Sequence, residues 1–164
     1  MEARSAHTNK RSVSQAVGYI RTKTKLKPHI ALILGSGLGD FVDSVEREHV
    51  IRNEEIPGYP PSTVPGHAGK IVLGYLRTNS SRSKPLLVFQ GRVHFYESGS
   101  LSPAFLPVQI AHGLGCKILI VTNAAGGINR RFQAGDLMLI RDIINLTNLQ
   151  PHPVGTLARP SRHK

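Results

Sequence analysis

Short apolar runs that alternate with helical patterns constrain the fold of this chain more than any other feature. Residues 12–26 and 103–115 each repeat apolar side chains at intervals of three or four, which is typical of amphipathic helices. Around them lie short apolar runs that resemble buried strands, at residues 29–34, 70–76, 85–89, 117–122 and 137–140. Strands that alternate with helices predict an α/β domain with a mixed, largely parallel sheet flanked by helices.

Size and composition favour a single globular domain without covalent cross-links. With 164 residues, 40% of them hydrophobic, the chain can bury a substantial core. A lone cysteine, Cys116, excludes an intramolecular disulfide framework. No apolar run reaches membrane-spanning length, and the polar start lacks the apolar core of a secretory signal. These features predict a cytoplasmic enzyme or binding protein.

The net charge of +11 is concentrated at the two ends of the chain. Residues 1–30 carry seven Lys and Arg against one acid, and residues 151–164 carry three against none. The intervening 120 residues have a net charge of only +2, and the chain contains no Trp for base stacking. We therefore interpret the basic ends as solvated tails or helix faces, and nucleic-acid binding is the less favoured alternative.

A glycine-rich turn follows the first predicted strand. It contains Gly35, Ser36 and Gly37, and apolar spacing after it predicts a helix start. Converging backbone N–H groups, the Ser36 hydroxyl and a helix N-terminus would together favour an anion. The turn does not match a dinucleotide-binding fingerprint, which needs glycine where Asp40 stands, and it lacks the Gly-Lys-Ser/Thr ending of a Walker A loop. Tight packing is the alternative explanation for such a turn.

A second candidate anion site follows the strand at 85–89. Arg92 and His94 are two residues apart, so an extended segment would place both side chains on one side. A planar guanidinium beside a second nitrogen donor suits an oxyanion such as phosphate, and Gly91 allows close backbone approach. Taken alone, the segment is explained equally well as an exposed loop.

A third turn, which contains Asn123 and Ala124, follows the strand at 117–122. Ligands of open α/β sheets gather at the carboxyl ends of strands, so the three segments are expected to meet there. Residues 56–69 contain four prolines and three glycines and therefore form a long loop. From this loop, His67 could close over the same place, although a lone loop histidine is more often only exposed.

The sequence gives little support for a metal site, a cysteine nucleophile or a pair of catalytic carboxylates. The histidines and Cys116 show no metal-ligand spacing, and Cys116 opens an apolar strand where packing is expected. Three possible acids, Glu97, Asp136 and Asp142, are not paired as a glycosidase would require. No nucleophile supplied by the protein itself can be named.

Five motifs occur in order along the chain, at Ile33–Gly39, Val64–Gly69, Gln90–Glu97, Val121–Gly127 and Gly135–Asp142. Taken together, they resemble those of purine nucleoside phosphorylase of the trimeric class. Their order and spacing match the family from about the helix at 12–26 to Leu146. Methylthioadenosine phosphorylases share the fold and parts of the pattern, and they are the nearest competitor. The resemblance implies the N-terminal part of a phosphorylase-type nucleoside-binding fold.

The resemblance also implies a reaction and a set of roles. In this family inorganic phosphate attacks C1′ of a purine nucleoside and gives free base and ribose 1-phosphate, which serves purine salvage. No metal or organic cofactor is implied, and the family is homotrimeric. Carried over by motif, the phosphate ligands would be Ser36, His67, Arg92, His94 and the backbone of Ala124, with His94 as the catalytic residue, Tyr96 against the ribose, and Gly35, Gly37 and Asn123 supporting the turns.

The resemblance weakens at Ile143, where the family has histidine, and ends after about Asn148. The predicted organisation is a partial phosphorylase domain at 1–148 followed by an irregular basic tail at 149–164, such as a frameshift or premature truncation would give. The family residues that read the purine lie in the missing half, so impaired activity and uncovered sheet edges are expected. A noncatalytic fragment that associates with a full-length relative or binds polyanions is the alternative.

Overall fold

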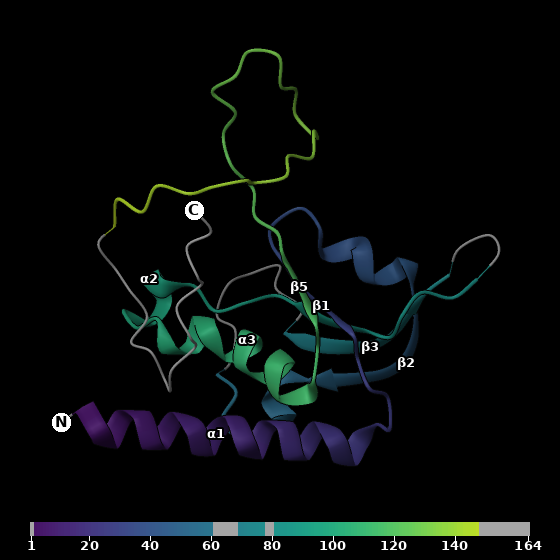
Figure 1. Cartoon of the computed structure of the whole chain (residues 1–164), viewed down its shortest axis with the longest axis vertical. Coiled ribbons are helices and arrows are strands. Elements are labelled where there is room, and N and C mark those ends of the chain that lie inside the picture. The colour runs from purple at the N-terminus through teal and green to yellow at the C-terminus, as the bar shows by residue number, and fades with distance from the viewer. Residues whose placement is uncertain (1, 61–68, 78–80, 148–164) are drawn as a thin grey trace, which may run out of the picture. The chain divides into compact units, whose positions relative to one another are not determined.

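The computed structural model describes residues 2–60, 69–77 and 81–147, and it divides into two compact units, Met1–Asn123 and Ala124–Lys164. The first unit contains a five-stranded sheet with the strand order β2-β3-β4-β1-β5 (Figure 1). The strands are β1 (Ile30–Leu34), β2 (Val45–Arg52), β3 (Lys70–Leu76), β4 (Leu86–Gln90) and β5 (Ile118–Val121). The α/β class and the mixed sheet predicted from the sequence are confirmed.

Parallel pairing brings three strand ends to the same edge of the sheet. Strand β1 pairs in parallel with both β4 and β5, whereas β3 pairs antiparallel with β2 and β4. In register, Ile33 of β1 lies opposite Phe89 of β4 and Val121 of β5. The segments that follow β1, β4 and β5 therefore leave the sheet side by side.

Two helices, α1 (Glu2–Lys23) and α3 (Ser102–Leu114), lie side by side against the sheet (Figure 1). The Arg21 Nη2 atom donates a hydrogen bond to the Gly113 carbonyl at 2.9 Å. A β-carbon added at Gly113 would lie only 2.7 Å from Val17 Cγ2, so glycine permits this close approach. Helix α1 begins ten residues earlier than the helix predicted at 12–26. None of the described helices is long and apolar enough to span a membrane.

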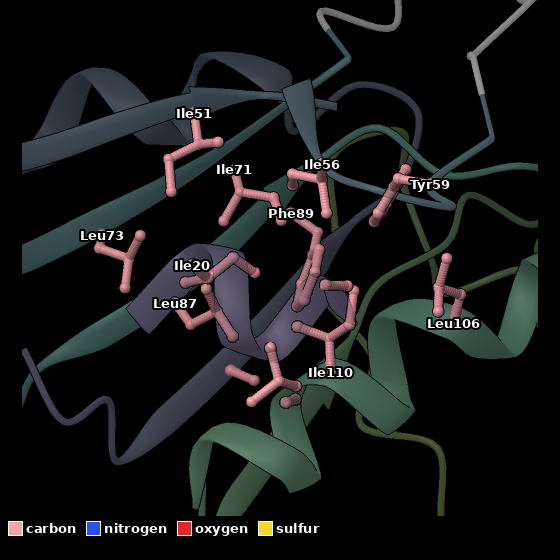
Figure 2. Close-up of a cluster of buried hydrophobic side chains, with 14 of the residues drawn as sticks. Ile20, Ile51, Ile56, Tyr59, Ile71, Leu73, Leu87, Phe89, Leu106 and Ile110 are labelled. Atoms are coloured by element: carbon pink, nitrogen blue, oxygen red, sulfur yellow. The ribbon is translucent and has the colours of Figure 1, made fainter. Parts of the chain in front are cut away.

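Strands β1, β3 and β4 are buried on both faces. Figure 2 shows Ile20 of α1 and Ile110 of α3 packed toward Leu87 and Phe89 of β4. The alternate residues of the strands form a second buried cluster on the opposite face, with members that include Val88. Burial on both faces explains why these strands are continuous apolar runs rather than alternating ones.

The helix predicted after the glycine-rich turn is wrong. A 3-10 helix, η1 (Gly39–Ser44), occupies only six residues, and the chain then enters strand β2, which the apolar pattern did not indicate. Charged residues occupy much of β2, and its register shifts between Arg47 and His49, so neither helical nor strand periodicity is clear. A 3-10 helix this short does not supply the helix-terminus potential expected at the Ser36 turn.

The strand predicted at 137–140 is also absent from the second unit. Residues 137–140 form no strand, and their side chains are 47–96% exposed. A short apolar segment forms a strand only when a neighbour pairs with it, and the described residues of this unit provide none. Within the described residues, β5 pairs only with β1, and its side chains are 41–53% exposed. This agrees with the expectation of uncovered apolar surface.

Candidate functional site

The Ser36 turn leaves the carboxyl end of β1. Gly37 has φ of 83°, in the left-handed region that glycine adopts readily. The Leu38 N–H donates to the Gly35 carbonyl at 3.3 Å and closes the turn, while Ser36 lies exposed at its tip. This exposure leaves Ser36 accessible to a ligand, and its role in binding an anion stays a prediction.

The Arg92–His94 segment leaves the carboxyl end of β4. Gly91 has φ of 106°, and the next three residues alternate in burial. Val93 is 7% exposed, whereas Arg92 and His94 are only half-buried. This alternation supports the expectation that the two basic side chains share one side of the segment.

His94 also begins the short helix α2 (Phe95–Ser98). Its backbone N–H donates to Glu97 Oε1 at 2.6 Å, which caps the helix. The His94 and Tyr96 rings are stacked, with centroids 5.1 Å apart and an interplanar angle of 8°. Tyr96 is 73% exposed, so an aromatic surface adjoins the basic segment.

Thr122, directly after β5, contacts both of these segments. Its Oγ1 accepts a hydrogen bond from the Gly35 N–H at 2.8 Å, and its carbonyl accepts one from Arg92 Nη1 at 2.9 Å. A β-carbon at Gly35 would lie 2.4 Å from that same carbonyl oxygen. Gln90 Nε2 adds a link between the ends of β4 and β1 by donating to the Gly39 carbonyl at 2.8 Å. The Ser36 turn and Arg92 are thus joined through Thr122.

The predicted site residues are only partly brought together. Asn123 is the exposed last residue of the first unit and follows Thr122 directly, whereas Ala124 begins the second unit. His67 lies outside the described residues. The roles that the resemblance assigns to the site residues, including those of Ala124, Asn123 and His67, stay predictions.

Sequence reasoning missed Thr122 and Gln90. Neither belongs to a glycine-rich turn or a basic pair. Gln90 contacts the Gly39 carbonyl through its side-chain amide, and Thr122 contacts Gly35 through its hydroxyl and Arg92 through its carbonyl. The available signal was position, because each is the polar residue that ends or follows an apolar strand. Such residues lie at the sheet edge where ligands gather.

Two of the possible acids, Asp136 and Asp142, accept hydrogen bonds from nearby backbone groups. Asp136 Oδ2 accepts the Gln133 N–H at 2.9 Å, and Asp142 Oδ1 accepts the Ile143 N–H at 2.8 Å. Burial raises the pKa of the Cys116 thiol to about 11, which disfavours the nucleophilic thiolate. In the part of the chain that the structure describes, no three His, Cys, Asp or Glu side chains are grouped so that they could hold a metal ion.

Curated proteins similar to this chain are purine nucleoside phosphorylases. Purine nucleoside phosphorylase 1 of Bacillus subtilis (strain 168) is 45% identical over 139 residues, which are 85% of this chain and 49% of the relative. The purine nucleoside phosphorylase of Rattus norvegicus is 47% identical over 128 residues, which are 78% of this chain and 43% of the relative. The chain spans about half the length of these relatives.

Solved structures give the same result. Isoform 2 of purine nucleoside phosphorylase from Schistosoma mansoni, in complex with cytosine and ribose-1-phosphate, matches with a TM-score of 0.65 and 38% identity, covering 77% of this chain and 42% of that one. The profile of the Phosphorylase superfamily matches residues 29–162. The resemblance noted in the sequence is confirmed, and the chain belongs to the phosphorylase superfamily.

Proposed function

We propose that this chain carries the phosphate-binding part of a purine nucleoside phosphorylase site. The observation that carries the proposal is the pair of hydrogen bonds by which Thr122 joins the Gly35 amide and the Arg92 guanidinium. Through it, an exposed serine turn and a half-buried arginine become neighbours at one edge of the sheet. The names of the relatives and the complex of a Schistosoma mansoni relative with ribose-1-phosphate support phosphate and a purine nucleoside as the substrates.

The chemistry of these groups fits a phosphate nucleophile. Arg92 offers a planar set of N–H donors, and the Ser36 turn offers a hydroxyl and backbone donors, so a dianion would be held from two directions. In the proposed reaction a phosphate oxygen forms a bond to C1′ while the glycosidic bond breaks. The purine leaves with the electron pair and is protonated, and ribose 1-phosphate is the second product. The chain itself supplies no nucleophile and the proposal includes no metal or organic cofactor.

Fixing phosphate at this edge would contribute to the rate in two ways. A positioned nucleophile removes much of the entropic cost of bringing two reactants together. The phosphate charge also stabilises the oxocarbenium-like sugar that develops as the glycosidic bond breaks. The stacked rings of His94 and Tyr96 offer a flat, exposed surface next to the phosphate, and we assign the ribose to this surface.

Turnover by this chain alone is proposed to be very low. It spans less than half of the relatives it matches, and the residues expected to read the purine belong to the part of the family beyond this match. Residues Ile118–Val121 of β5 are 41–53% exposed, which leaves the sheet uncovered beside the site. A homotrimer and a cytoplasmic location remain predictions that rest on the sequence.

The experiment combines binding and turnover on the purified full chain. Titration calorimetry should detect binding of inorganic phosphate, and Arg92→Ala should weaken it at least about tenfold, since hydrogen bonds to charged groups contribute roughly 1.5–3 kcal/mol. The matched control is Arg77→Ala, because Arg77 is an arginine paired with Glu46 at the far end of β3. Equal affinity of wild type and Arg92→Ala would reject the site. Robust release of hypoxanthine from inosine would reject the proposed loss of turnover.

A further inference from the structure

We propose that Thr122 is a positioning residue that sets the Ser36 turn and Arg92 at a fixed separation for phosphate. The inference rests on the proposed function and deepens it. Thr122 does not occur in the set of phosphate ligands carried over by resemblance. Three of its polar atoms, the N–H, the hydroxyl and the carbonyl, contact β1, the turn after β1 and the segment after β4.

The hydroxyl holds the beginning of the turn. Thr122 Oγ1 accepts the Gly35 N–H at 2.8 Å and lies 3.3 Å from the Ile33 carbonyl, to which it donates. A hydroxyl can do both because it carries one donor and two acceptor lone pairs. The residue just before Ser36 is therefore fixed by a side chain that lies 87 residues further along the chain, directly after β5.

The carbonyl holds the arginine. Arg92 Nη1 donates to Thr122 O at 2.9 Å, which uses one corner of the guanidinium and restricts the orientation of the rest. The Thr122 peptide group is also held to β1, because its N–H donates to the Ile33 carbonyl at 3.0 Å and extends the β1–β5 pairing. The same residue therefore orients a cation and an anion-binding turn relative to one another.

Gly35 completes this arrangement from the other side. A β-carbon there would lie 2.4 Å from Thr122 O, so the turn and the carbonyl that holds Arg92 are in close contact. Any shift of the Thr122 peptide must move both segments. This coupling is what distinguishes a positioning role from ordinary strand pairing.

The test compares two substitutions of the same side chain. Thr122→Val keeps the β-branched shape but removes the hydroxyl, whereas Thr122→Ser keeps the hydroxyl. Thr22→Val is the matched control, since the exposed Thr22 hydroxyl on α1 also donates to a backbone carbonyl, that of Tyr19, and α1 supplies no residue to the site. Affinity for inorganic phosphate is measured by calorimetry, and exchange of the Gly35 amide hydrogen is measured by NMR in the same proteins.

We expect Thr122→Val to weaken phosphate binding about 3- to 10-fold, the effect of one lost neutral hydrogen bond, and to speed exchange at Gly35. Thr122→Ser should stay within about twofold of wild type in affinity, a rescue that a change in strand packing alone would not give. Equal affinity of wild type and Thr122→Val would overturn the inference. If the wild-type chain does not bind phosphate, the proposed function is overturned. In that case Gly35 exchange decides the positioning role, and an unchanged exchange rate in Thr122→Val would reject it.

Discussion

Replacing Gly35 with alanine tests the contact between the Ser36 turn and the end of β5. The added β-carbon would lie 2.4 Å from Thr122 O, 3.0 Å from the Thr122 carbonyl carbon and 3.1 Å from Asn123 Cα. All three are backbone atoms, so no side-chain rotation relieves the overlap. The φ angle of Gly35 is not positive, and the substitution therefore probes sterics rather than backbone strain.

The expected cost follows from the movement required. Ordinary contact begins near 3.4 Å, so the carbonyl and the turn must separate by about 1.0 Å, the difference between 3.4 and 2.4 Å. Overpacking of this kind costs roughly 1–3 kcal/mol. The same movement weakens the Gly35–Thr122 and Arg92–Thr122 hydrogen bonds without breaking them, a loss of about half of the roughly 1 kcal/mol that each contributes. The free energy of unfolding should therefore fall by about 2–4 kcal/mol.

Urea denaturation followed by circular dichroism measures this change on the full chain. Gly39→Ala, at the start of η1 four residues later, is the matched control, because its β-carbon would meet only Gln90 Nε2 at 3.9 Å. It should change the free energy of unfolding by less than about 0.5 kcal/mol, as surface substitutions usually do. A Gly35→Ala protein as stable as Gly39→Ala would refute the close contact and, with it, the link between the Ser36 turn and Arg92.

Two further predictions concern the core and the cysteine. Phe89→Ala should lower the free energy of unfolding by about 3–5 kcal/mol, because Phe89 is 1% exposed. The control Phe95→Ala, at a site 39% exposed, should lower it by less than half as much. Equal losses of unfolding free energy in urea denaturation would contradict the assigned core. Burial raises the pKa of Cys116 from 9.0 to about 11, so its thiolate appears only as the pH approaches 11. At pH 8 iodoacetamide should then modify the native chain roughly a hundredfold more slowly than the urea-unfolded chain, and equal rates would contradict the burial of this thiol.

Most of the sheet could be predicted because its strands are continuous apolar runs. The bounds of strands β1, β3, β4 and β5 lie within one or two residues of the predicted bounds, and each of these strands pairs with at least one other strand of the sheet. Strand β2 was missed because charged residues and a register shift hide its periodicity. Residues 137–140 have the apolar composition of a strand, but composition does not provide a pairing partner.

In the candidate site, features that depend on residues close in sequence could be predicted, and features that depend on strand pairing could not. Glycines and basic residues close in sequence indicated the Ser36 turn and the Arg92–His94 segment, since their chemistry is local. Thr122 was not predicted because its role depends on the parallel register that aligns Ile33 with Val121. Only pairing between strands far apart in sequence makes one threonine a neighbour of both segments.

The most direct test of the account is a residue-resolved titration of the full chain with inorganic phosphate, followed by ¹H–¹⁵N NMR. We expect the largest shifts at Gly35, Ser36, Gly37, Arg92 and His94, with small ones along α1. Arg92→Ala should abolish this pattern at equal phosphate concentrations. Shifts confined to the Lys and Arg residues of α1, or an unchanged pattern in Arg92→Ala, would contradict a phosphate site at the ends of β1 and β4.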